Sequence, residues 1–148
     1  MNNSLKITAF ALCGAFVFTG CSANGPQFTK FDTPKDDKSL VYVYRTSGLG
    51  GAITPKIHQT DLTTNEDKVI GYVEPSGYIK AEIKDGDYQF WAKTEAKNEV
   101  DLKIEKNKIY CIESYITMGF FVGHPQFKLI PLDKCEAEIK TTKLTIQE

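Results

Sequence analysis

The sequence holds four cysteines, and their thiols are its groups best suited to covalent chemistry; they are Cys13, Cys21, Cys111 and Cys135. A thiolate can be alkylated, can form a disulfide with a second cysteine, or can bind a metal ion beside histidine. The neighbours and the compartment of each cysteine decide which of these reactions is open to it.

Cys21 follows an apolar stretch at the N-terminus. Lys6 precedes this stretch, residues 7–18 are mostly apolar, and no Asp or Glu occurs before Cys21. The pattern is typical of a secretory signal peptide. A membrane-spanning helix needs about 20 apolar residues, which is more than this run supplies. A transmembrane anchor or a buried N-terminal helix is the alternative interpretation.

The residues Phe18-Thr19-Gly20-Cys21 resemble the lipobox of bacterial lipoproteins. The resemblance implies that the thiol of Cys21 carries a diacylglyceryl group, that the chain is cleaved after residue 20, and that the new N-terminus is acylated. Phe18 departs from the pattern, which usually has an aliphatic residue there. Two or more acyl chains anchor a protein stably, so we expect a lipid-anchored protein of the cell envelope. Ser22 in place of Asp favours the outer membrane, and Cys13 is expected to leave with the signal peptide.

The predicted organisation has three parts: a lipoprotein signal peptide (1–20), a lipidated N-terminus with a flexible tether (21–38), and one β-sandwich domain (39–148). The tether is predicted because residues 22–38 are polar and contain glycine, prolines and a charged run. Phe28 and Phe31 could add a short pairing segment to its end.

The charge of the mature chain gives no reason to expect nucleic-acid binding. Cleavage removes one of the 18 basic residues, Lys6, and none of the 19 acidic residues, which leaves a net charge of −2. A nucleic-acid-binding domain normally shows a basic patch or a pI above about 9.

From Ser39 onward, short runs of β-branched and aromatic residues predict strands. Residues 39–46 are apolar on both faces, which predicts a central strand. Residues 77–83 alternate, and the Asp85-Gly86 pair after them predicts a hairpin into residues 88–94. Further runs raise the count to seven or more, so we expect a mainly β protein with an antiparallel β-sandwich. The predicted core consists of apolar residues with a period of two: Val41, Val43, Ile79, Ala81, Ile83, Phe90, Val100, Leu102, Ile104 and Ile112.

A short helix is predicted over residues 133–140, followed by a strand-like tail. Asp133 and Glu136 have the spacing of a capping box. Leu132, Cys135 and Ile139 would then share one face of the helix.

Three blocks, SLVYVYR, GYVEPSGYIKAEIKDGDYQFWA and IEKNKIYCIE, resemble a family of small bacterial lipoproteins that contain a domain of unknown function. The resemblance covers residues 39–144. It implies an immunoglobulin-like or transthyretin-like sandwich, and it implies no catalytic residues.

Cys111 and Cys135 are the cysteines that remain after cleavage and lipidation. In an oxidising compartment we expect them to form a disulfide. Two separate buried thiols are an alternative. A metal site with His124 is a third reading, although it lacks a fourth ligand and a CxxC pair.

Catalytic and cofactor motifs are not found. The histidines, His58 and His124, have no adjacent carboxylate, and no GxSxG, HExxH or phosphate-binding pattern occurs. We therefore expect a protein that is not an enzyme and that uses no cofactor and no metal.

Two kinds of binding remain. The first is a protein-interaction module of the envelope that binds through strand edges and loops. Phe120 and Phe121 in the MGFFVG stretch could touch a partner or the bilayer, although a buried strand is the favoured reading of that stretch. The alternative is a binder of a small envelope ligand, a glycan or a lipid, with an aromatic platform drawn from Tyr72, Tyr78, Trp91, Phe120 and Phe121.

Overall fold

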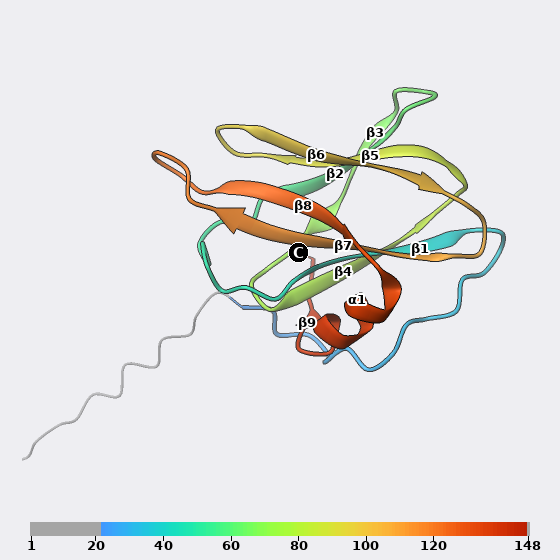
Figure 1. The fold of residues 1–148 in the computed structure, drawn as a ribbon, viewed down its shortest axis with the longest axis horizontal. Coiled ribbons are helices and arrows are strands. Elements are labelled where there is room, and N and C mark those ends of the chain that lie inside the picture. The colour runs from blue at the N-terminus through green and yellow to red at the C-terminus, as the bar shows by residue number, and fades with distance from the viewer. Residues whose placement is uncertain (1–21, 148) are drawn as a thin grey trace, which may run out of the picture.

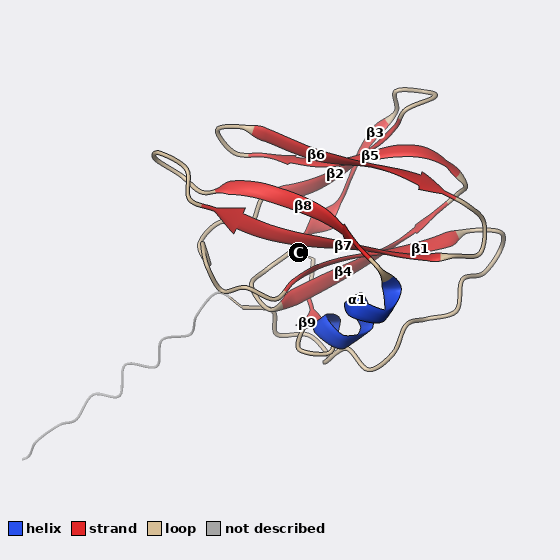
Figure 2. Cartoon of the chain, in the orientation of Figure 1, coloured by secondary structure: helices blue, strands red, loops and turns tan. Residues whose placement is uncertain are grey.

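The structure of the protein is a computed structural model, and it describes residues 22–147. Two β-sheets pack face to face, and one short helix lies against the outside of one of them (Figures 1 and 2). The elements follow the order β1 (Ser39–Arg45), β2 (Lys56–Asp61), β3 (Asp67–Tyr72), β4 (Gly77–Ile83), β5 (Gly86–Lys93), β6 (Lys97–Ile104), β7 (Ile109–Thr117), β8 (His124–Ile130), α1 (Leu132–Ile139) and β9 (Lys143–Leu144).

The first sheet has five strands in the order β8-β7-β1-β4-β9, and the second has four in the order β3-β2-β5-β6. The prediction of a mainly β sandwich with seven or more strands and a short C-terminal helix is confirmed. Two pairings differ from the expected antiparallel arrangement, since β1 pairs with β7, and β4 with β9, in parallel. Both join distant parts of the chain, which a hairpin cannot do.

The inner core fills the space between the sheets, and the predicted core residues lie in it. Eight of the ten are buried, while Ala81 and Val100 are partly buried and pack against the others. The core also contains four buried residues that were not predicted: Ile57, Val73, Tyr88 and Ala92. Tyr88 and Ala92 share the inward face of β5 with Phe90, and Val73 follows β3. Ile57 lies in β2, whose sequence is only weakly patterned.

β1 is the central strand of the five-stranded sheet, as its sequence predicts, and all seven of its residues are buried. Val41 and Val43 face the inner core. Tyr42 and Tyr44 face the opposite side, where a second cluster covers the sheet. This outer cluster consists of Phe28, Leu40, Tyr42, Tyr44, Cys111, Ile130, Cys135 and Ile139.

Helix α1 begins one residue earlier than predicted, and the predicted capping box does not form. Its N-cap is Pro131, without a side-chain cap, and Asp133 lies inside the first turn, where a negative charge favours the helix dipole. Cys135 and Ile139 are fully buried as expected, but Leu132 is 44 % exposed. Proline fixes its own φ and removes a donor, which sets the start of the helix.

The Asp85-Gly86 pair does not form a hairpin. β4 belongs to the five-stranded sheet and β5 to the four-stranded sheet, so these residues carry the chain from one sheet to the other. Gly86 has a φ of 152°, which a residue with a side chain rarely adopts. A local turn signal thus marks a change of direction without saying which strands pair.

The segment predicted as a tether packs against the domain. Ala23 is 3 % and Phe28 is 4 % exposed. The amide of Phe28 donates to Thr142 O at 3.0 Å, and Gln27 forms an antiparallel bridge with Lys143. Residues 25–28 therefore cover the edge of the five-stranded sheet beside β9. This part of the predicted flexible tether is packed, and the short pairing segment suggested at Phe28 is present.

Candidate functional site

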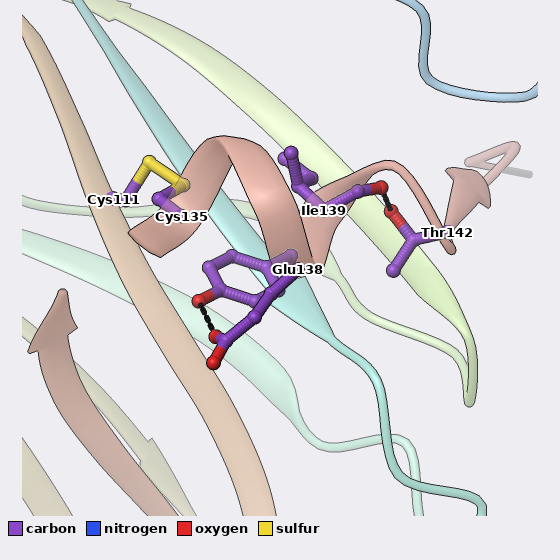
Figure 3. The surroundings of a disulfide bond; sticks show 6 residues. Cys111, Cys135, Glu138, Ile139 and Thr142 are labelled. Carbon is purple, nitrogen blue, oxygen red and sulfur yellow. Dashed lines mark hydrogen bonds between the residues drawn. A yellow bond between two sulfur atoms is a disulfide. The ribbon is translucent and has the colours of Figure 1, made fainter. Parts of the chain in front are cut away.

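The Cys111–Cys135 disulfide joins β7 to helix α1, and the two Cα atoms are 6.2 Å apart (Figure 3). Both cysteines are buried. The predicted pairing is present, and the metal site with His124 is therefore not formed by these cysteines. Among residues 22–147, no group of three or more His, Cys, Asp or Glu side chains is placed to hold a metal ion.

A hydrogen bond holds the other end of α1 to the same sheet. The Tyr44 hydroxyl of β1 donates to the Glu138 carboxylate at 2.6 Å. Burial raises the pKa of the Tyr44 hydroxyl, and the adjacent Glu138 carboxylate raises it further, so Tyr44 remains a donor. After α1, the Thr142 hydroxyl donates to Ile139 O at 2.7 Å (Figure 3). Together with the disulfide, these contacts fix the helix against the sheet.

The predicted aromatic platform does not form. Tyr78 packs against Phe28, with ring centroids 5.4 Å apart, under the N-terminal segment. Trp91 lies on the outer face of the other sheet, and the Tyr72 hydroxyl donates to Ile146 O at 2.9 Å. Phe120 lies in the β7–β8 loop. No single cavity could be lined by these residues together.

Trp91 has both faces of its ring occupied. His58, from β2, stacks on it at 3.9 Å between centroids. The Lys97 ammonium, from β6 on the other side, lies 5.0 Å from the ring centroid. The indole N–H donates to Thr60 Oγ1 at 3.0 Å and to Asp67 Oδ1 at 3.1 Å. A sugar ring that stacked on Trp91 would have to displace His58 or the Lys97 ammonium.

A His58–Asp67 pair, which the residue pattern did not predict, lies beside Trp91. The β2–β3 hairpin brings the two together, and His58 Nδ1 lies 2.8 Å from Asp67 Oδ2. Burial tends to raise the pKa of Asp67, but hydrogen bonds from Thr60, His58 and Trp91 lower it overall. The nine-residue spacing across the turn was the available signal.

This pair is not arranged for nucleophilic catalysis. The Thr60 hydroxyl donates to Asp67 Oδ1 at 2.7 Å, so it is bound to the carboxylate rather than to the imidazole. An activated nucleophile needs a hydrogen bond to the base. The cluster is a cross-strand network on an exposed sheet face, and such networks stabilise sheets.

The β7–β8 loop, residues 118–123, is the most exposed apolar part of the described chain. Met118 is 82 %, Phe120 91 % and Phe121 84 % exposed. The favoured sequence reading of a buried strand is therefore wrong. Gly119 and Gly123 account for the exposed turn in place of a strand, because a side chain on Gly119 would overlap Val122 O and one on Gly123 would overlap Ile116. The glycines permit a tight turn that directs the bulky side chains outward.

A second loop, residues 46–55, packs beside this turn and is organised by Arg45. The Arg45 side chain is 1 % exposed, and its guanidinium donates to Ile53 O at 2.8 Å, to Ser47 O at 3.2 Å and to Leu49 O. Burial lowers the pKa of Arg45, although a guanidinium stays protonated in proteins. No residue pattern around Arg45 predicts that this cation is buried.

Strand β3 has an open edge in the described chain. It is the outermost strand of its sheet, and Val69 is 49 % exposed. The Asp61 amide donates to Glu66 O at 2.9 Å, and pairing alternates along antiparallel strands. Asp67 and Val69 therefore direct their backbone N–H and C=O groups away from β2. At the other end of β3, the Gln147 side chain binds both backbone groups of Tyr72.

Comparison with known proteins adds one distant relative. Over 118 residues the chain is 25 % identical to a protein of Haemophilus influenzae strain Rd that is described as uncharacterized, covering 79 % of this chain and 67 % of that protein. No family model matches the chain. No solved structure matches it either.

No helix within residues 22–147 combines the length and the apolar character that crossing a membrane requires. The lipidation predicted for Cys21 falls outside the described residues.

Proposed function

We propose that the protein is a lipid-anchored, non-enzymatic module of the cell envelope that binds a protein partner by strand addition at β3. The open backbone groups of Asp67 and Val69 carry this proposal. An exposed strand edge offers main-chain hydrogen bonds to an extended segment, and the neighbouring side chains then select it.

The other sheet edges are less suited to this role. Residues 25–28 cover β9, and β6 lies alongside β8 where the two sheets meet (Figure 1). Lys68 and the irregularity between Ile57 and His58 are features that keep an edge from pairing with unrelated chains. They favour a short, selective contact over a long one.

The dispersed aromatic residues favour the protein module over the alternative, a binder of a glycan or lipid. A small-ligand site is normally a concave pocket with apolar walls and a few convergent polar groups. The pocket beside Lys30, Phe31, Asp32, Lys80 and Glu82 has a volume of about 670 Å³, but it is open and mostly charged. The Lys80 ammonium and the Asp32 carboxylate within it already pair with each other.

The anchor is tested with Cys21→Ala. We propose acylation at this thiol, so the variant should lose label from radioactive palmitate and move to the soluble fraction. Cys13→Ala serves as the matched control and should behave as the wild type. Membrane association of Cys21→Ala equal to that of the wild type would contradict the anchor.

The β3 edge is tested by placing a photo-crosslinking amino acid at residue 68 in intact cells. We expect one recurrent envelope protein to be captured. Val69→Pro removes an outward N–H and should abolish the capture, whereas Val69→Thr keeps the backbone donor and should preserve it. Equal capture by both variants would contradict strand addition, and saturable binding of a glycan or lipid without any capture would favour the alternative.

A further inference from the structure

We propose that the domain sits end-on against the lipid bilayer, with the β7–β8 loop (residues 118–123) inserted into it. The inference rests on the proposed lipidation of Cys21 and adds a membrane contact that the folded domain makes itself. The protein would thus contact the bilayer at two places, through its acyl chains and through the loop.

The point where the chain enters the domain leaves almost no slack. Ala23 is 3 % exposed, and its amide donates to Pro75 O at 3.1 Å. Only Ser22 separates Ala23 from Cys21. Because consecutive Cα atoms are about 3.8 Å apart, the acylated residue must lie within about 8 Å of Ala23 Cα. The end of the sandwich that holds Ala23 and Pro75 must therefore lie close to the membrane surface.

The β7–β8 loop lies at this same end. Residues 46–55 connect the two places: a Cβ added to Gly51 would lie 3.8 Å from Pro75 Cγ, and one added to Gly123 would lie 2.8 Å from Ile53 Cδ1. In Figure 1 the beginning of the described chain and the β7–β8 loop are both on the left. A surface that receives the acyl chains near Ala23 also meets this loop.

The chemistry of this end suits a bilayer. Residues 46–55 and 118–123 contain no charged side chain. Leu49 is 55 % exposed beside the loop, and the rings of Phe120 and Phe121 meet edge to face at 4.8 Å. Large exposed apolar groups on a small domain mark a contact surface, and aromatic side chains are favoured at the membrane interface.

The opposite end could not take this position. Its turns contain the charged residues Lys35, Asp36, Asp37, Lys38, Lys84, Asp85, Glu105, Lys106 and Lys108. At the apolar end, the charged groups surround the loop rather than lie in it: Glu95 lies 3.4 Å from His124, Lys93 and Lys97 pair at the end of the β5–β6 hairpin, and Glu74 follows β3. The loop itself is held from the side, since the Thr94 hydroxyl donates to Gly123 O at 3.0 Å.

The test uses full-length protein, processed in cells and reconstituted into vesicles of phosphatidylethanolamine and phosphatidylglycerol that contain brominated acyl chains. Phe121→Trp places a fluorescent probe in the loop, and Lys106→Trp is the matched control at the charged end. Both are made in a Trp91→Phe background to remove the native signal. Vesicle flotation first reports whether the protein is anchored.

We expect both proteins to float. The emission of the residue 121 probe should shift to the blue and lose most of its intensity to bromine, while the emission of the residue 106 probe is unchanged. Flotation without quenching at residue 121 would overturn the insertion and leave the anchor intact. Loss of flotation would overturn both. A blue shift at residue 121 in native envelope membranes but not in protein-free vesicles would identify a protein as the occupant and contradict the bilayer contact.

Discussion

The two sheets of the sandwich treat their outer faces in opposite ways. The five-stranded sheet is apolar on both sides, and helix α1, the N-terminal segment and the disulfide cover its outer face. The four-stranded sheet leaves its outer face open, with a polar network around Trp91 and Asp67. The five-stranded sheet is thus the middle layer of a three-layered structure, whereas the four-stranded sheet exposes its outer face.

This difference separates the part of the molecule that stabilises the fold from the part whose surface is open to contact. Burial of apolar area is the main source of folding free energy, and the covered sheet has it on both faces. Exposed networks of partly solvated side chains contribute little. Substitutions should therefore cost much in the shared core, less in the outer cluster, and least on the open face.

The largest effect is expected from Phe90→Ala. Phe90 has no exposed surface and lies between the two sheets, so the variant loses the transfer free energy of the ring and leaves a cavity. We expect the free energy of unfolding to fall by about 3–5 kcal/mol, measured by urea denaturation. A loss below about 1 kcal/mol would mean that the sheets do not share this core.

The next effect concerns the disulfide. Cys111→Ala with Cys135→Ala opens a link across 24 residues, for which loop entropy gives about 3–4 kcal/mol. Amide hydrogen exchange should quicken in α1 and β7 and stay unchanged in β5. An equal rise in the exchange rates of both sheets would contradict this, because the disulfide would then stabilise the whole sandwich and not only the outer layer.

Phe28→Ala tests the N-terminal part of the cover. Its ring meets Tyr42 and Tyr78 edge to face, and we expect a loss of about 2–3 kcal/mol, less than for Phe90 because the peripheral segment can close over the gap. Thr29→Ala, at an exposed neighbouring position, is the control and should leave the midpoint of unfolding unchanged. Equal midpoints for the two variants would mean that the segment is a free tether after all.

The smallest effect is expected from Asp67→Asn on the open face. The pKa of Asp67 is lowered in the folded protein, so its contribution to stability is present above the ordinary value of 3.8 and is lost as the pH falls through the lower folded value. We expect a difference from wild type of about 0.5 kcal/mol at pH 7 that vanishes in acid. Unfolding curves at both pH values measure it, and a difference that grows in acid would contradict the sign.

The sequence predicted the parts of this fold in which local patterning and tertiary position agree. β1 is apolar on both faces and is buried on both, and the alternation in β4 and β6 identified their inward residues. Cys135 and Ile139 were correctly placed on the inner face of α1 from helical spacing. In these elements, the spacing of the apolar residues is enough to predict which side chains are buried.

The parts that were not predicted depend on distant partners. Asp85-Gly86 indicates a turn, but the sheet that receives the next strand is decided by packing. Arg45 was not recognised as buried because its acceptors are backbone carbonyls, which no residue pattern reveals. A pairing segment was suggested around Phe28, but its partner was not, because residues 142–144, more than a hundred residues later, supply the hydrogen bonds.

The pairing of the two chain ends has a consequence for the order of folding. Phe28 binds Thr142 and Gln27 bridges Lys143, so the first and last described segments complete the same sheet edge. Contacts between residues far apart in sequence form slowly, because a long loop must close first. A chain that crosses a membrane N-terminus first cannot finish its covered sheet until its last residues have emerged. Under the export that we propose, the covered sheet would therefore stay incomplete, and the chain would remain able to be threaded, until its last residues had crossed.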